Sequence, residues 1–243
     1  MNNSPQEYLT FANKLADAAG ITSMEYFRTS LSIDSKSDES PVTIADQNTE
    51  LKIRSMIEKE YPNHGILGEE FDSVNPDAEF IWVIDPIDGT RSYIAGHKDF
   101  GNLISLTQNK KPIIGIINCP AHDERWVGVI NQKSTVNQKI VKTSNVTEIE
   151  DAYIFTSGLY FDEPQLRNAV DKIKNKVRYF RYGGDCYMYG MVASGLIDIV
   201  IEDTLKAHDY MALVNGIEGA GGVISDKFGN EITTDSEGSV VAS

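Results

Sequence analysis

One stretch in the first half of the chain constrains the fold more than any other. It reads Trp82-Val83-Ile84-Asp85-Pro86-Ile87-Asp88-Gly89-Thr90, an apolar run that ends in two aspartates, a glycine and a hydroxyl. A short apolar run bounded by turn residues is typical of a buried strand. We therefore expect a strand that ends at Ile84 and opens into a loop. Two carboxylates at the mouth of this loop predict a site for Mg2+, which prefers oxygen ligands.

The other residues of the loop fit the same site. Pro86 fixes the backbone and lacks an N–H, so the carbonyl of Ile87 can turn toward a cation instead of joining a sheet. Gly89 can adopt a conformation closed to other residues, and its N–H and that of Thr90 can then face a phosphate. Aspartates in turns also serve as solvated or capping residues. The pattern alone leaves both interpretations open.

More acidic residues stand next to predicted strands elsewhere in the chain. Glu69 and Glu70 follow a short strand, and such adjacent like charges are tolerated in water or near a cation. Asp209 stands at a predicted helix start, where a plain N-cap is the alternative role. A calcium-binding structural site is a further interpretation of the same residues.

Composition limits the partners. The 243 residues include 36 acidic and 22 basic side chains, giving a net charge of −14, which disfavours nucleic acid and anionic membranes. An anionic substrate would then need a bound cation to attract it. The two cysteines, Cys119 and Cys186, form no C-x-x-C pair and predict neither a zinc site nor a disulfide. No apolar stretch approaches the roughly 18 residues of a membrane span, so we expect a cytoplasmic protein.

Apolar periodicity predicts two helices and then a meander of strands in the first half. The helices run from Ser4 to Phe27 and from Val42 to Tyr61, and the polar residues 32–41 between them predict a mobile loop. Strands are expected at 66–68, 80–84, 103–107, 112–118 and 125–130.

The second half alternates strands with helices. Strands are expected at 152–156, 177–180, 197–201 and 223–224, and helices at 164–174, 185–193 and 209–219. The change of rhythm near residue 145 predicts an N-terminal α+β subdomain, 1–145, with the metal-binding loop. A C-terminal α/β subdomain, 146–243, would complete the active site.

Several stretches together resemble the signature sequences of the inositol monophosphatase superfamily. They are Gly68-Glu69-Glu70, Asp85-Pro86-Ile87-Asp88-Gly89-Thr90, His208-Asp209-Tyr210-Met211-Ala212 with Glu218-Gly219-Ala220-Gly221-Gly222, and Pro41-Val42-Thr43 to Asp46. The resemblance implies a layered α-β-α-β-α fold of the α/β class and a homodimer. It also implies hydrolysis of small phosphate monoesters with two or three Mg2+ ions per active site.

The resemblance also implies a role for each matching residue. Glu69 and Asp85 would bind one metal with the Ile87 carbonyl, and Asp85, Asp88 and Asp209 the second. The catalytic set would be Asp46, Thr90 and Glu69, with Asp46 and Thr90 activating a water and the Gly89 and Thr90 amides binding phosphate. Two metals suit this chemistry because one activates the water while the other stabilises the leaving oxygen.

Other stretches are similar to the histidinol-phosphate phosphatase branch. They are Gly89-Thr90-Arg91-Ser92-Tyr93, Phe100-Gly101, Glu124-Arg125-Trp126-Val127-Gly128 and Arg181-Tyr182-Gly183-Gly184-Asp185-Cys186-Tyr187. Gly184, Asp185 and Glu202 match substrate-contacting positions, and acidic groups there would favour the ammonium of histidinol phosphate. Asp185 is equally suited to cap the following helix, and both roles are compatible.

The sequence departs from that branch beside the ligands. Tyr93 and Tyr210 replace an expected phenylalanine, and Ala207-His208 replaces Pro-Tyr, which bears on substrate preference and leaves the metal ligands intact. An inositol or sugar-phosphate phosphatase is therefore the rival interpretation. A catalytically inactive protein that binds a phosphorylated metabolite or a metal is the alternative from another class, disfavoured because the implied ligands are all present.

Overall fold

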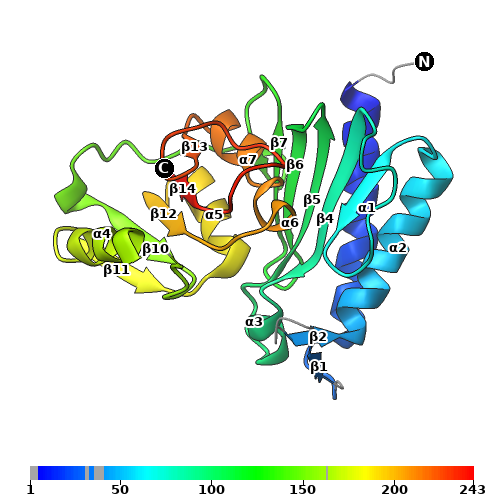
Figure 1. Cartoon of the computed structure of the whole chain (residues 1–243), viewed down its shortest axis with the longest axis horizontal. Coiled ribbons are helices and arrows are strands. Elements are labelled where there is room, and N and C mark those ends of the chain that lie inside the picture. The colour runs from blue at the N-terminus through cyan, green and yellow to red at the C-terminus, as the bar shows by residue number, and fades with distance from the viewer. Residues whose placement is uncertain (1–4, 31–32, 36–40, 163) are drawn as a thin grey trace.

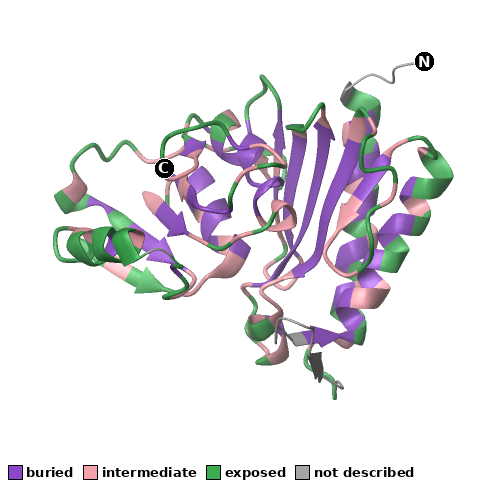
Figure 2. Ribbon diagram, in the orientation of Figure 1, coloured by how far each residue is buried: buried purple, intermediate pink, exposed green. Residues whose placement is uncertain are grey.

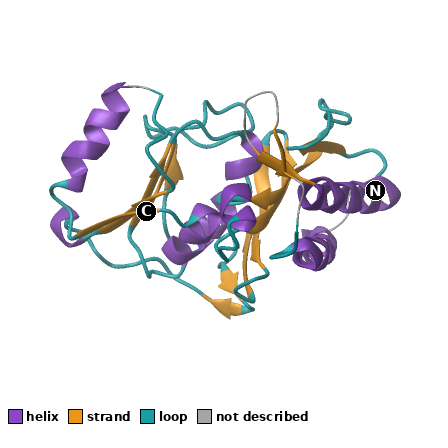
Figure 3. Cartoon of the chain, turned by 90° about the horizontal axis from the view of Figure 1, so that it is seen from below, coloured by secondary structure: helices purple, strands orange, loops and turns teal. Residues whose placement is uncertain are grey.

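The structure, a computed structural model, describes residues 5–30, 33–35, 41–162 and 164–243. It has five layers, which Figure 3 shows from one end of the molecule to the other: helices, a sheet, helices, a second sheet and one helix. The layered α-β-α-β-α architecture implied by the resemblance is confirmed. No helix in these ranges is both long enough and apolar enough to cross a membrane.

A seven-stranded sheet forms the second layer. Its spatial order follows the sequence, with β3 and β4 parallel and every later pair antiparallel. The strands are β3 (Gly65–Gly68), β4 (Phe80–Asp88), β5 (Gly101–Gln108), β6 (Lys111–Cys119), β7 (Glu124–Val129), β8 (Thr135–Val136) and β9 (Lys139–Ile140). Two long helices, α1 (Pro5–Tyr26) and α2 (Ile44–Glu60), cover its outer face (Figure 1).

A five-stranded sheet forms the fourth layer, in the order β11-β10-β12-β14-β13. Its strands are β10 (Tyr153–Thr156), β11 (Tyr179–Tyr182), β12 (Ile199–Glu202), β13 (Ile224–Ser225) and β14 (Val240–Ala242). The helices between the two sheets are α5 (Asp185–Ala193), α6 (Ala207–Tyr210) and α7 (Val214–Gly219), and α4 (Pro164–Lys174) covers the far side. The remaining elements are β1 (Ile33–Ser35), β2 (Pro41–Thr43), α3 (Thr90–Ile94) and a 3-10 turn, η1 (Ile149–Asp151).

Side chains alternate across β4 and so divide the core in two. Trp82 and Ile84 join the cluster under α1 and α2, whereas Ile81 and Val83 join the cluster between the sheets. That second cluster also combines Trp126 with residues of α5 and α7, so the two halves of the chain share one core. The burial of the central strands is visible in Figure 2. The division at residue 145 stays a prediction.

The structure differs from the sequence-based elements in several places. The helix predicted over 209–219 is two short helices, α6 and α7, separated by residues 211–213. Strand β14 was not predicted, and β11 begins two residues later than expected. Within the predicted loop 32–41, residues 33–35 form β1 and pair with β2. The Ser4 cap, residue 32 and residues 36–40 of that loop lie outside the described residues.

Candidate active site

The two aspartates of β4 face the same side of the sheet because of an irregularity between them. Asp85 and Asp88 pair with β5 residues only two positions apart, Leu103 and Gly101. One extra residue therefore stands in β4, as a β-bulge at Pro86 and Ile87. Residues three apart in a regular strand point to opposite faces, and the bulge restores a common direction. The prediction that the strand ends at Ile84 was wrong: β4 continues to Asp88.

Asp209 reaches the same place from the second half of the chain. Carboxylate oxygens of Asp85, Asp88 and Asp209 all lie within 4.8 Å of one another. Asp209 is the third residue of α6, and its Oδ2 accepts a hydrogen bond of 2.6 Å from the backbone N–H of Lys206. The structure thus brings together three residues predicted as metal ligands.

Burial and mutual repulsion disfavour the ionised form of the carboxyl groups in this cluster. Burial is the first cause that raises the pKa of Asp85 well above 3.8, and neighbouring Glu69, Asp88 and Asp209 add to it. Burial also raises the pKa of Asp88 well above 3.8, and neighbouring Asp185, Asp209 and Glu202 add to it. A divalent cation would offset this repulsion, and a donor set made only of oxygen suits Mg2+ or Ca2+. The residues therefore fit the predicted metal.

A buried ion pair holds the turn that carries Glu69. Glu50 and Arg54 of α2 form a salt bridge of 2.7 Å with both side chains almost inaccessible. The other Glu50 oxygen accepts from the N–H of Glu70 at 2.8 Å, and Arg54 donates to the carbonyls of Phe71 and Asp72. A side chain at Gly68 would collide with the Glu50 carboxylate. The pair therefore fixes the path of the chain through Glu69.

Asp46 lies at the start of α2, fully buried, with both oxygens engaged. Its Oδ2 accepts hydrogen bonds from the N–H and the hydroxyl of Thr43, at 2.8 and 2.6 Å. Its Oδ1 lies 3.3 Å from the Thr90 hydroxyl, which is also 3.2 Å from the Ile87 carbonyl. Burial raises the pKa of Asp46, and the Thr43 hydrogen bonds oppose the rise. The predicted pair of Asp46 and Thr90 is thus in contact.

Gly89 turns the chain from β4 into α3 with a left-handed backbone, φ +81°. A Cβ at this position would lie 2.8 Å from Cγ of Asp185, so the turn and the Asp185 side chain are closely packed. The Ser92 hydroxyl in α3 donates to Asp185 at 2.6 Å. Gly89 therefore lies between the metal-ligand strand and the predicted substrate residue.

Helix α5 begins at Asp185 and contacts the acidic cluster through its first turn. The backbone N–H of Cys186 donates to Oδ2 of Asp88 at 2.7 Å. The N-cap position belongs to Gly184, without a side-chain cap, so the predicted capping role of Asp185 is wrong. Burial raises the pKa of the Asp185 carboxyl, while the Ser92 hydrogen bond opposes the rise.

A pocket of about 130 Å3 joins the metal-ligand cluster to the predicted substrate residues. Its lining includes Asp88 and Asp209 together with Asp185 and Glu202. The Tyr189 hydroxyl donates to Glu202 at 2.7 Å, and burial raises the pKa of Glu202 to about 7. Four of the predicted site residues therefore line this pocket, and Gly89 packs against one of them, Asp185. Gly184 precedes Asp185 and packs against Met188.

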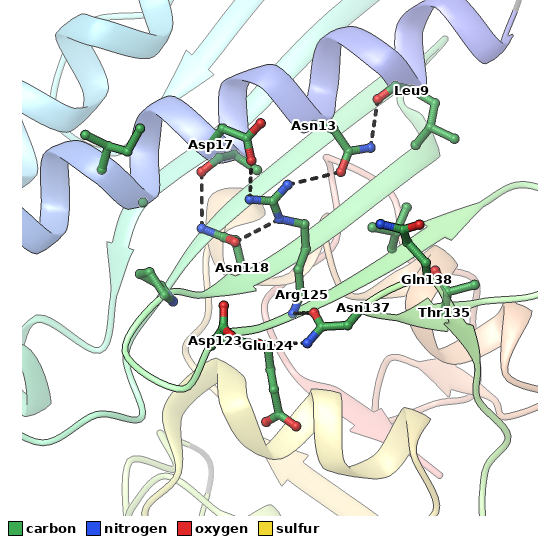
Figure 4. A pocket seen from close by; sticks show the side chains of 15 residues that line it. Leu9, Asn13, Asp17, Asn118, Asp123, Glu124, Arg125, Thr135, Asn137 and Gln138 are labelled. Carbon is green, nitrogen blue, oxygen red and sulfur yellow. Dashed lines mark hydrogen bonds and ion pairs between the residues drawn. The ribbon is translucent and has the colours of Figure 1, made fainter.

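A larger hollow, about 880 Å3, lies between α1 and the β6–β7 turn, and its lining contains none of the clustered carboxylates. Figure 4 shows Arg125 at its centre, donating to Asn118, Asn13 and Asp17 at 2.9, 3.2 and 2.7 Å. These polar groups are paired with one another and connect β7 to α1. The stretch from Glu124 to Gly128 that resembled the histidinol-phosphate branch therefore includes a structural arginine.

The supporting residues Glu50, Arg54, Ser92 and Tyr189 were not singled out from the sequence. Glu50 and Arg54 have the spacing of an ordinary i, i+4 pair on a helix surface. Tertiary contacts distinguish this buried pair from an exposed one: the packing of Gly68 against Glu50 and the hydrogen bonds to the backbone of residues 70–72.

Comparison with known proteins agrees with the fold. The statistical model of the inositol monophosphatase family matches residues 4–243. The chain is 39% identical to the bifunctional phosphatase IMPL2, chloroplastic, of Arabidopsis thaliana, over 99% of this chain and 72% of that protein. It is 36% identical to a histidinol-phosphatase of Chlorobaculum parvum, over 96% of this chain and 91% of that protein.

A solved structure of an inositol monophosphatase from Zymomonas mobilis superposes with a TM-score of 0.90 at 40% identity, covering 99% of this chain and 94% of that one. The family match spans nearly the whole chain, and two relatives exceed 30% identity over most of their length. The chain belongs to the inositol monophosphatase family and is a phosphatase that acts on phosphoric monoesters.

Proposed function

We propose that the chain hydrolyses L-histidinol phosphate to L-histidinol in a Mg2+-dependent reaction of histidine biosynthesis. The observation that carries this proposal is the pair of carboxyl groups, Asp185 and Glu202, in one pocket with Asp88 and Asp209. Asp88 and Asp209 are the proposed metal ligands, so Asp185 and Glu202 remain available to bind the substrate. An acidic end of the pocket suits an alcohol that carries an ammonium group better than an uncharged polyol.

Two or three Mg2+ ions would be held by the acidic cluster. Glu69, Asp85 and the Ile87 carbonyl would hold one, and Asp85, Asp88 and Asp209 another. When bound, the cations supply positive charge for the phosphate and the leaving oxygen and acidify water. The Gly89 and Thr90 amides, at the beginning of α3, would bind the phosphate, because the first N–H groups of a helix are not used in its own hydrogen bonds.

The chain's own acid–base groups are Asp46 and Thr90. The Thr90 hydroxyl donates toward Asp46, so its oxygen is free to accept a hydrogen bond from the attacking water. The proton of that water then passes through Thr90 to Asp46, whose raised pKa makes it a stronger base than an exposed aspartate. Thr43 orients Asp46 through two hydrogen bonds and keeps Oδ1 directed at Thr90.

The rival function is hydrolysis of inositol phosphate, the activity in the name of the Zymomonas mobilis structure. The same metal ligands and the same water-activating pair would serve it, so these groups do not distinguish the two substrates. The distinction depends on Asp185, which Ser92 orients, and on Glu202, which Tyr189 orients. We further propose a cytoplasmic homodimer that binds neither nucleic acid nor membrane, with sedimentation velocity as the test of the dimer.

The test of substrate is an initial-rate comparison of histidinol phosphate and inositol 1-phosphate, with Mg2+ and with a chelator. Histidinol phosphate should have the higher kcat/KM. The variant Asp185→Asn should lower kcat/KM for histidinol phosphate more than for inositol phosphate, because it removes only the charge. Asparagine tolerates the positive φ of this position, +41°, so the variant should fold. The control Asp171→Asn removes an exposed charge on α4. Equal loss for both substrates would refute ammonium recognition.

A further inference from the structure

The pocket beside the metal-ligand cluster is too small for a whole phosphate ester. It encloses about 130 Å3, whereas pockets for small ligands usually have roughly 300–1,000 Å3. The cations and the phosphate would occupy much of that space. The part of the substrate's alcohol farthest from the phosphate must therefore extend beyond it.

A second hollow, about 340 Å3, shares one lining residue with the first. Ser157 lines both of them and also hydrogen-bonds Glu202. The remaining lining consists of Gly158, Leu159, Tyr160 and Tyr182. The wall of the second hollow is therefore aromatic and aliphatic, in contrast to the carboxylates of the first.

Leu159 and Tyr160 expose more than half of their surface, 56% and 59%, and Tyr182 exposes 39%. Clustered exposure of large apolar side chains commonly marks a binding surface. Here the cluster lies directly beside the proposed catalytic pocket, so the substrate itself is the natural occupant.

Specific contacts hold the two tyrosines in place. The Tyr160 ring packs over Gly158, where an added Cβ would lie 2.5 Å from Cε2 of the ring. Arg91, the residue after Thr90, donates to the Tyr160 hydroxyl at 3.0 Å and lies 5.5 Å from the ring centre. The loop after β10 is thereby attached to α3 and the proposed phosphate site.

Tyr182 is held by a separate set of contacts. It is the last residue of β11 and pairs in register with Thr156 of β10. The ammonium of Lys174 donates to its hydroxyl at 3.0 Å, and the Phe180 ring packs against it at a centroid distance of 5.3 Å. Its position three residues before Asp185 places an aromatic wall next to the proposed ammonium-binding carboxylates.

We infer that this second hollow is the subsite for a planar aromatic ring on the substrate's alcohol, with Tyr160 and Tyr182 as its specificity-determining residues. The inference rests on the proposed function and adds to it: Asp185 and Glu202 bind the ammonium of histidinol phosphate, and the tyrosine-lined hollow binds the imidazole. Offset-stacked or edge-to-face contacts between rings stabilise a complex beyond the effect of the apolar area that they bury.

The test compares histidinol phosphate with 2-aminopropyl phosphate, which has the same ammonium and the same ester without the imidazole. The ratio of their kcat/KM values measures the contribution of the ring alone. Tyr160→Ala should lower this ratio roughly ten-fold, the size expected for losing a ring contact and its buried area. Tyr182→Ala should lower it in the same direction. Tyr160→Phe keeps the ring and should preserve the ratio.

Tyr179→Ala is the matched control, because Tyr179 is an exposed tyrosine of the same strand that does not line the hollow. Circular dichroism and thermal melting of each variant establish that it is folded. An unchanged ratio in both Tyr160→Ala and Tyr182→Ala, or an equal fall in Tyr179→Ala, would overturn the inference.

The proposed function and the subsite can fail separately. A wild-type protein that prefers inositol phosphate over histidinol phosphate refutes the function. If the ratio of histidinol phosphate to 2-aminopropyl phosphate nevertheless falls in Tyr160→Ala, the aromatic subsite stands.

Discussion

Glu202 should make the protein less stable as the pH rises, in the absence of a cation. Burial is the main cause that raises its pKa from 4.5 to about 7. A raised pKa means that the folded protein holds this proton more tightly than the unfolded chain, so ionising Glu202 opposes folding. The difference corresponds to roughly 3 kcal/mol at about 1.4 kcal/mol per pH unit. The penalty is absent below pH 4.5, grows between pH 4.5 and 7, and is then constant.

The variant Glu202→Gln removes this ionisation and keeps an acceptor for the Tyr189 hydroxyl. At pH 8 with a chelator, its free energy of unfolding should exceed that of the wild type by about 3 kcal/mol, and the two should converge near pH 4. Urea denaturation across this pH range measures the difference. The control Glu58→Gln changes an exposed glutamate of α2 and should show no such trend. A wild type that is more stable than Glu202→Gln at pH 8, or a difference that does not depend on pH, would refute the reasoning.

Three further predictions concern the metal cluster and its supports. Asp88→Asn should abolish Mg2+-dependent phosphate release. It should also reduce the stabilisation of the fold by Mg2+, which in the wild type is about 2.7 kcal/mol at a Mg2+ concentration of 100 times Kd and is seen as a rise in melting temperature. Unchanged activity would exclude Asp88 as a ligand. Glu50→Gln should weaken Mg2+ binding in calorimetry roughly ten-fold, the lower end for residues that support metal ligands, because it loosens the Glu69 turn; unaltered binding in a folded variant would contradict this role. Gly89→Ala should destabilise the fold by about 1 kcal/mol or more and reduce kcat/KM, because φ is +81° and the new Cβ would lie 2.8 Å from Cγ of Asp185; a wild-type melting temperature would disprove the steric argument.

Periodicity predicted the long elements because each buries one face. The helix α1 and the strands β5 to β7 each follow a regular apolar pattern, and the structure has them within two residues of the expected bounds; β4 begins where expected and continues past Ile84 to Asp88. The short elements follow no such pattern. Strand β14 has only three residues, Val240–Ala242, and exists through pairing with β12 and β13, which lie far away in sequence.

The ligands of the candidate site could be selected from the sequence because the motifs themselves contain them. Their supports could not, because each acts across the fold. Cys186 contacts Asp88 through a backbone N–H, a group that every residue but proline has, over a separation of 98 residues. The Glu50 carboxylate is useful only because β3 brings the Gly68 turn onto it. Such roles depend on tertiary packing, which no local pattern encodes.

The bulge in β4 also limits how the length of this segment can vary. Turns commonly gain or lose single residues without harm, but in the Asp85–Asp88 segment the extra residue is part of the bulge. Deleting one residue from it would leave the two aspartates two positions apart, so a regular strand would keep both carboxylates on the same face, opposite Leu103 and Gly101. The loss would be the bulge itself, which places the Ile87 carbonyl 3.2 Å from the Thr90 hydroxyl. A single-residue deletion would therefore preserve the carboxylate pair and disrupt the turn that leads to Thr90.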